Sequence, residues 1–301
     1  MADAAADWCR RLAHIAVPVL PRSRSAISGF REYEDNVTPR EVAGSVLLDP
    51  FMTLRVLQYL QAHRRASQTH DITTIDRALM MFGMRRFFAH FTDLPDVEAR
   101  LVQFPEALDG LRRVLSRARH AALYARDWAI ARHDVDTDEI VVAALLHDLA
   151  EMLLWCAAPQ LMLEIATRLR ADPTLRSADA QVAHLGCRVL DVQLMLLREW
   201  DLPSLLHDLI DDREASRPRV INVSLAVALA RHSARGWDDA ALPDDLMAIQ
   251  RLLHISMEQV HARVNRVAVR AARDWEWYGV RPSAYWLVAA RNAKQALRQA
   301  A

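Results

Sequence analysis

The pentapeptide Leu-Leu-His-Asp-Leu occurs twice in the chain, at residues 145–149 and 205–209. Each copy places a histidine directly before an aspartate within an apolar, helix-forming stretch. An imidazole beside a carboxylate suits a divalent Mn, Fe or Mg ion. Such an ion would act as a Lewis acid and would convert bound water into a hydroxide nucleophile for phosphoester hydrolysis. The function therefore depends on whether either His-Asp pair has further ligands nearby.

The first copy has one histidine that is placed to join it. His120 precedes His147 by 27 residues and lies in the preceding helical stretch. Two antiparallel helices joined by a short loop would bring His120 opposite His147 and Asp148, and these three residues are the ligand set of a metal site, if there is one. They are one ligand short, and spacing alone favours the alternative, in which the pair has a structural role. The aspartates that could supply a fourth ligand are Asp191, Asp201 and Asp208.

The second copy lacks a comparable partner. No histidine lies at a matching distance before His207, and Asp208 is followed by two further aspartates, which is typical of a half-exposed amphipathic helix. His184 and Cys187 form a His-x-x-Cys pair, but a structural zinc site needs four ligands and no second pair completes the set. We therefore assign structural roles to both motifs.

The composition is that of a globular protein with balanced charge. Of the 301 residues, 52% are hydrophobic and 25% are charged, and 38 basic side chains are matched by 38 acidic ones. This balance gives no sign of a basic surface for nucleic acid or for a membrane. The three cysteines form no Cys-x-x-Cys pair, which is typical of a reduced, cytoplasmic protein. No glycine-rich phosphate-binding motif is present, which argues against a Rossmann or P-loop fold.

Apolar residues recur with helical spacing almost throughout the chain, which predicts an all-α fold. A buried stripe runs through residues 107–131 and becomes all alanine in its second half, so a neighbouring helix can approach closely there. A second helix is expected from Thr137, which opens an acidic first turn, to Trp155. Further helices are expected at about residues 40–48, 51–64, 74–82, 84–91, 160–170, 178–199, 203–211, 219–235, 244–252, 256–277 and 283–299.

Beyond the two pentapeptides, a series of short motifs follows in a characteristic order and spacing. These motifs are Pro18–Pro21, Val46–Phe51, Leu54–Leu57, Ile72–Ile75, Ala78–Leu79, Gly83–Arg86, His120, Ala143–Leu149, Leu185–Gly186 and Trp200–Pro203. Together they resemble the HDOD domain, the HD-related output domain of bacterial signalling proteins, over residues 17–215. The resemblance implies a multi-helix, HD-like bundle, which in that family is generally regarded as non-catalytic relative to true HD phosphohydrolases.

The chain departs from the HDOD pattern at positions that bear on chemistry. The glycine that usually precedes Leu-Leu-His-Asp is Ala144. Glu151 stands where the family has a basic residue, and its charge would repel a phosphate substrate. The later histidines of the family are absent as well, and Val189, Arg213 and Glu214 stand in their places. Gln181 and Gln193 also depart from the pattern. The HD motif is therefore degenerate even by the standard of this family.

The sequence and the resemblance together predict three parts: an N-terminal helix at residues 1–16, an HDOD domain at 17–215, and a C-terminal helical extension at 216–301 that packs on the core. We expect a non-catalytic, cytoplasmic bacterial signal-transduction or regulatory protein without a cofactor. It would bind another signalling protein, but no nucleic acid or membrane, and the extension would help to form that surface or a homodimer interface.

Two alternatives stay open at this point. The first is a metal-dependent HD phosphohydrolase, such as a cyclic-dinucleotide phosphodiesterase, with His120, His147 and Asp148 as ligands of a divalent Mn, Fe or Mg ion. The second is a sensor that binds a small ligand in the vestigial HD pocket. A fourth metal ligand that converges on the three residues would favour the first alternative.

Overall fold

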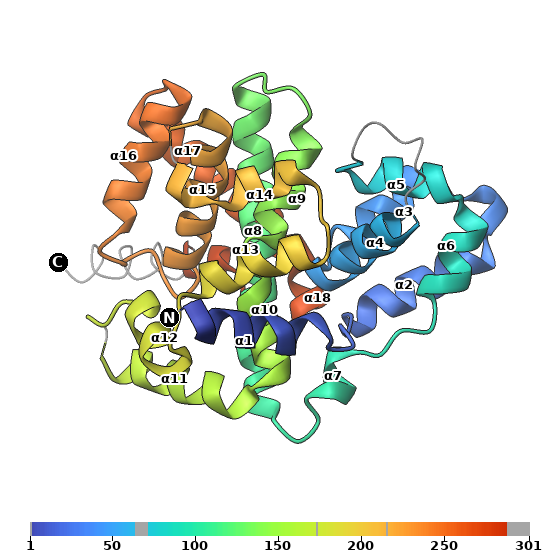
Figure 1. Cartoon of the computed structure of the whole chain (residues 1–301). Helices are drawn as coiled ribbons and strands as arrows, with labels where there is room; N and C mark the ends of the chain where they lie inside the picture. The colour runs from blue at the N-terminus through green and yellow to red at the C-terminus, as the bar shows by residue number, and fades with distance from the viewer. Residues whose placement is uncertain (1, 64–71, 173, 215, 288–301) are drawn as a thin grey trace, which may run out of the picture.

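The computed structural model describes residues 2–63, 72–172, 174–214 and 216–287, which form helices joined by short turns (Figure 1). No strand occurs in this part of the chain, so the all-α prediction is confirmed. The helices of the first half are α1 (Ala2–Ala13), α2 (Pro21–Glu32), α3 (Pro39–Val46), α4 (Pro50–Ala62), α5 (Ile75–Phe82), α6 (Met84–Phe91), α7 (Val97–Arg100) and α8 (Pro105–Ala131). Those of the second half are α9 (Thr137–Leu146), α10 (Leu149–Ala157), α11 (Pro159–Ala171), α12 (Ser177–Leu185), α13 (Val189–Glu199), α14 (Ser204–Ile210), α15 (Pro218–His232), α16 (Leu242–Leu253), α17 (Met257–Ala271) and α18 (Trp275–Tyr278).

The longest helix, α8, lies at the centre of the molecule (Figure 1). It begins at Pro105, which suits a first helical turn because proline lacks only an N–H that would have no partner there. Helices α9, α10, α11, α15 and α17 pack against it, and α9 and α15 do so most extensively. The predicted alanine stripe is buried along this helix. Asn222 of α15, itself fully buried, donates a hydrogen bond from Nδ2 to the carbonyl oxygen of Ala125 at 3.1 Å.

A buried carboxylate holds the N-terminal helices together at the start of α4. Asp49 is completely buried and caps α4 by accepting hydrogen bonds from the backbone N–H groups of Phe51 (2.9 Å) and Met52 (3.3 Å). Its second oxygen accepts a hydrogen bond from the N–H of Leu20 at 2.6 Å. Burial raises the pKa of Asp49, and these hydrogen bonds oppose the rise. One side chain therefore joins the residue before α2 to the first turn of α4.

The C-terminal helices share one hydrophobic core with the N-terminal ones. Tyr278 of α18 is buried and donates its hydroxyl to the carbonyl oxygen of Leu48 at 2.6 Å, just before α4 begins. Next to it, Nε of Arg119 in α8 pairs with Asp274 at 2.8 Å. Residues 216–278 are therefore built into the same core as the rest of the described chain.

Three helices that the sequence analysis expected to be continuous are broken. The one expected at residues 256–277 divides into α17 and α18, with a short 3₁₀ turn at Ala272–Asp274 between them. The other two breaks change the direction of the chain. The helix expected at residues 137–155 stops as α9 and resumes as α10, with His147 and Asp148 in the turn between them. The helix expected at 178–199 stops at Gly186, whose φ of +73° lies in the left-handed region that glycine enters without steric cost. In both places, apolar periodicity continues across a change of direction, which periodicity alone does not reveal.

Two helices, α2 and the short α7, were not predicted from the sequence. Helix α2 begins at Pro21, a residue type that can open a helix as well as end one. The helix expected at residues 283–299 falls largely outside the described residues. Residues 137–157 contain an 18-residue window that is long and apolar enough to span a membrane by length and composition. Since 78% of that window is buried inside the protein, its neighbours in the core account for its apolar character.

The close approach of α8 and α10 at Gly110 gives a first prediction. A Cβ atom at Gly110 would lie 2.6 and 2.7 Å from Cζ3 and Cζ2 of the buried Trp155 ring. We expect Gly110→Ala to lower the free energy of unfolding by about 1–2 kcal/mol, because the cost of overpacking exceeds the gain in helix propensity. Urea denaturation followed by circular dichroism measures this change.

The matched control is Gly44→Ala in α3, where a new Cβ would meet nothing within 4 Å. Alanine there should raise the free energy of unfolding by roughly 0.5–1 kcal/mol, since only the helix propensity changes. If both variants shift stability in the same direction, the contact between Gly110 and Trp155 is not as close as described.

Candidate functional site

The first His-Asp pair lies in the turn between α9 and α10, beside α8 and α15. Residues 140–146, which precede it, are almost completely buried, so the His-Asp pair lies inside the bundle. Asp148 is the residue before the first turn of α10, but its side chain makes no capping hydrogen bond to that helix. The carboxylate is therefore free to meet side chains from other helices.

Asp148 is held by one histidine and two arginines. Oδ1 accepts from Nδ1 of His147 at 3.0 Å and from Nη2 of Arg231 at 3.2 Å. Oδ2 lies 3.4 Å from the same atom of Arg231 and 3.7 Å from Nη2 of Arg117. Burial alone would raise the pKa of Asp148, but Arg231, the hydrogen bond from His147 and Arg117 outweigh it and hold that pKa well below its ordinary range. The carboxylate is therefore ionised, although its side chain is only 11% exposed.

A second carboxylate joins the same network. Nη2 of Arg117 lies 3.1 and 3.2 Å from the two oxygens of Glu151, and both side chains are largely buried. The charge of Asp148 raises the pKa of Arg231, and Glu151 adds to the effect despite partial opposition from burial. The sequence analysis expected the charge of Glu151 to repel a phosphate substrate. The structure adds that Arg117 pairs with this carboxylate, which sequence alone did not indicate.

Gln193 of α13 closes the break between α9 and α10. Its Nε2 donates to the carbonyl oxygen of Leu146 at 2.9 Å, and its Oε1 accepts from the N–H of Ala150 at 2.7 Å. The side chain is 1% exposed. A helix break leaves backbone groups without their usual partners, and burying such groups unpaired is costly. The amide supplies both partners, so a position noted only as a departure from the family pattern has a defined structural role.

His120 lies in α8, is 5% exposed and takes no part in the ion-pair network of Asp148. Burial lowers the pKa of His120 to about 4; the charge of Arg119 lowers it further, and that of Asp274 opposes the shift. His120 is therefore a neutral, buried imidazole at neutral pH. Arg119 and Asp274, whose charges shift its pKa, pair with each other where α8 meets the C-terminal helices.

The side chains that a metal ion would need are not assembled. Within residues 2–63, 72–172, 174–214 and 216–287, no group of three or more His, Cys, Asp or Glu side chains is arranged to hold a metal ion. His120, His147 and Asp148 do not converge as ligands, and neither Asp191, Asp201 nor Asp208 completes a set with them. The residues present therefore do not fit the divalent ion that the alternative function requires.

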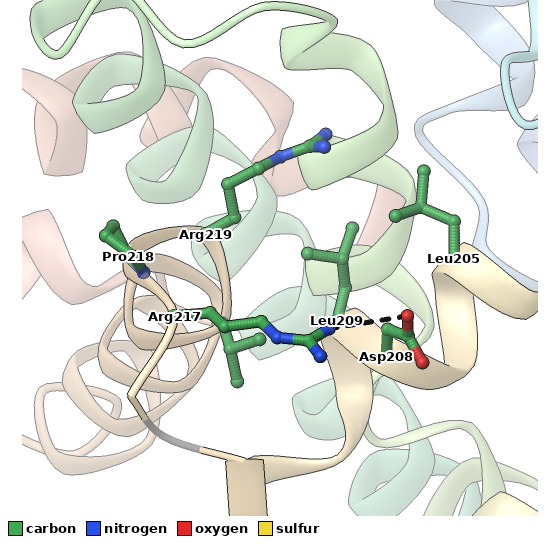
Figure 2. Close-up of a pocket in the computed structure, with 7 residues that line it drawn as sticks. Leu205, Asp208, Leu209, Arg217, Pro218 and Arg219 are labelled. Atoms are coloured by element: carbon green, nitrogen blue, oxygen red, sulfur yellow. Dashed lines mark ion pairs between the residues drawn. The ribbon is translucent and has the colours of Figure 1, made fainter.

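The second pentapeptide lies on the surface. Asp208 of α14 is 58% exposed and pairs with Arg217 at 3.5 Å (Figure 2). Both residues line a cavity of about 230 Å³, together with Leu205, Leu209 and Val220. Burial lowers the pKa of His207, as for any half-buried imidazole. The arrangement is that of the half-exposed amphipathic helix expected from the sequence.

A family model for the HDOD domain matches residues 17–215, which is more than half of the chain, and the chain therefore belongs to the HDOD family. Arg231 lies outside the matched residues, so the Asp148 network joins the family domain to the segment that follows it. A search of proteins with curated functions finds none that matches this sequence.

Two solved structures share this fold, and each aligns with this chain over nearly its whole length. The MmoQ response regulator from Methylococcus capsulatus str. Bath aligns with a TM-score of 0.62 and 19% identity, over 84% of this chain and 99% of that chain. A virulence factor from Campylobacter jejuni subsp. jejuni aligns with a TM-score of 0.63 and 18% identity, over 89% of this chain and 99% of its own. At such identities the likeness concerns the fold.

The Asp148 network gives a prediction for stability. Asp148→Ala would leave Arg117 and Arg231 without the carboxylate that they share. Removal of one partner from a buried ion pair costs on the order of 3–5 kcal/mol, and because Arg231 is 39% exposed we expect a loss of about 2–4 kcal/mol in the free energy of unfolding. Urea denaturation of the full chain measures it.

Asp208→Ala in the second pentapeptide is the matched control. Its carboxylate is exposed and pairs with an exposed arginine, so its loss should cost less than about 0.5 kcal/mol. In addition, Asp148→Leu combined with Arg231→Met should be less destabilised than the sum of the two single changes, because the pair is removed together. Equal losses from Asp148→Ala and Asp208→Ala would show that the Asp148 network does not stabilise the fold.

The depressed pKa of His120 gives a prediction for pH. An unfolded histidine titrates near about 6.5, so between that pH and about 4 the unfolded chain binds more protons than the folded one at this position. Stability from His120 is therefore fully present above about pH 6.5 and is lost as the pH falls towards 4, by up to about 3 kcal/mol. The difference in free energy of unfolding between about pH 7 and pH 4.5 should shrink in His120→Asn. An unchanged difference would mean that folding does not lower the pKa of His120.

Proposed function

We propose that this protein is a non-catalytic signalling or regulatory component of the bacterial cytoplasm, and that it acts by binding another protein. One observation carries the proposal. The aspartate of the HD motif is engaged by two guanidinium groups, Arg117 (3.7 Å) and Arg231 (3.2 Å), on the oxygens that a metal ion would need. The HD pair then serves as a buried tie between α8, α15 and the turn from α9 to α10.

Electrostatics supports the absence of metal-dependent catalysis. A divalent cation at Asp148 would meet two fixed positive charges within about 4 Å, and their repulsion would be strong in a site of low dielectric constant. A guanidinium neutralises a carboxylate but cannot bind and activate a water molecule as a metal does. The chain's own residues therefore provide charge balance at this position without providing a nucleophile.

The family and a protein with the same fold support a role in signalling. The HDOD family covers residues 17–215, and one protein with this fold carries the description of a response regulator. A protein that transmits a signal without chemistry needs surfaces for a partner more than it needs an enclosed catalytic site. The same reasoning favours a protein partner over nucleic acid, a membrane or a cofactor. Whether the chain also forms a homodimer is a separate property of such surfaces.

One feature favours the metal-dependent phosphohydrolase as the second candidate. Nε2 of His147 is buried and has no hydrogen-bond partner in the described part of the chain, while Nδ1 faces Asp148. Histidines that bind metals often have this arrangement, in which a carboxylate orients the ring from behind. A ligand-sensing role would likewise use this buried nitrogen. Neither alternative has a set of converging ligands to support it.

Metal content and turnover decide between the candidates. We expect the purified full-length protein, incubated with Mn²⁺ and then dialysed, to retain far less than about one ion per chain by elemental analysis. We also expect no hydrolysis of bis(p-nitrophenyl) phosphate above a heat-denatured sample. The phosphohydrolase would instead bind about one ion, lose it in His147→Ala, and hydrolyse the phosphodiester in a reaction that Asp148→Ala abolishes while Asp208→Ala does not.

A further inference from the structure

Five arginines, four from three helices and one from the segment after α15, lie around the Asp148 network. α8 contributes Arg113 and Arg117, which are one helical turn apart and so lie on the same face. α11, which packs on α8, carries Arg170 in its last turn. α15, the other helix packed here, carries Arg231 in its last turn, and Arg235 follows shortly after the helix ends. We call these five residues the arginine cluster.

Shared contacts and mutual repulsion both place these residues together. Arg117 and Arg231 reach the same carboxylate from two different helices. Partial burial lowers the pKa of Arg235, and the positive charges of Arg113, Arg117 and Arg170 lower it further. Every charge that shifts the pKa of Arg235 is that of another guanidinium, which indicates a region of positive potential.

Three members of the cluster have no acidic partner. In the described part of the chain, no carboxylate lies within 4 Å of Arg113, Arg170 or Arg235, and all three are exposed. Asp148 and Glu151, the two carboxylates of the network, are paired with Arg117 and Arg231. The cluster therefore presents positive charge to the solvent in a chain whose overall charge is zero.

We propose that the arginine cluster is the docking surface for an acidic segment of a partner protein, and this inference rests on the protein-binding function proposed above. A carboxylate accepts two parallel hydrogen bonds from one guanidinium, and three guanidinium groups without a carboxylate partner suit a segment with several acidic side chains. The three side chains are exposed to solvent, where an extended segment of another protein can reach them. The cavities of about 290 and 230 Å³ are lined by other residues.

Nucleic acid fits this surface less well. A protein that holds a nucleic acid neutralises many phosphates along an extended basic track, and the measured salt dependence reflects that number. Here three side chains carry the positive charge that no carboxylate balances, and the network beside them holds two carboxylates. A short acidic peptide matches both the amount of charge and its compact arrangement.

The test uses the full chain and a fluorescein-labelled ten-residue oligoglutamate, with binding followed by fluorescence anisotropy at low salt. The combined variant Arg113→Ala, Arg170→Ala, Arg235→Ala removes the free charges and leaves the partners of Asp148 and Glu151 in place. We expect the affinity to fall at least tenfold in this variant and to weaken as salt rises. The matched control is Arg31→Ala, Arg40→Ala, Arg85→Ala on α2, α3 and α6, which should change the affinity less than twofold. Circular dichroism and melting temperatures check that both variants are folded.

Several outcomes would overturn the proposal. Equal affinity for the wild type and the combined variant would show that the cluster is not the site. So would equal binding of an uncharged glutamine peptide, or tighter binding of a single-stranded oligonucleotide with the same charge that the variant also loses. Complete loss of oligoglutamate binding in millimolar inorganic phosphate at constant ionic strength would assign the cluster to a small anion instead. Metal content and phosphodiester turnover are measured separately, so a failure here leaves the non-catalytic assignment standing, and a catalytic result there does not depend on the peptide.

Discussion

A buried carboxylate is stable only where positive charge or hydrogen-bond donors reach it, and Asp148 places that constraint at the centre of this protein. The residue lies in a turn between two helices that are themselves inside the bundle. The charge it needs comes from α8 and from α15, through Arg117 and Arg231. Correct packing of these helices and ionisation of one aspartate are therefore coupled. Because α15 follows the residues matched by the family model, the domain and the segment after it are joined by this contact.

Under the proposed function, the same arrangement would account for a His-Asp motif that is kept without metal-dependent chemistry. In a metal site, the aspartate offers its oxygens to a cation that also carries an open position for water. Here two guanidinium groups take up those oxygens and balance the charge. Guanidinium groups fulfil the electrostatic requirement of the carboxylate and supply no activated water. The His-Asp pair then contributes to the fold, together with the amide of Gln193 that completes the broken helix.

Overall charge proved a poor guide to the local surface. The balance of basic and acidic residues gave no indication of a basic patch, since it averages over the whole chain. In the folded protein, arginines from α8, α11 and α15 meet at one place, and only some of them find carboxylates. Positive charge therefore accumulates through packing, between residues that lie up to 122 positions apart in sequence, as Arg113 and Arg235 do.

The sequence by itself determined the helical character of the chain and the apolar stripe of α8. Each of these depends on interactions within one or two helical turns, which a local pattern records. Only the tertiary structure decided that the helix breaks at His147 and Asp148, that Arg231 pairs with Asp148 across 83 residues, and that His120 stays apart from both. Those outcomes depend on the angles and distances at which α8, α9 and α15 pack. A displacement of a few ångströms, which leaves every local pattern unchanged, determines whether a carboxylate meets an arginine, a histidine or a metal ion.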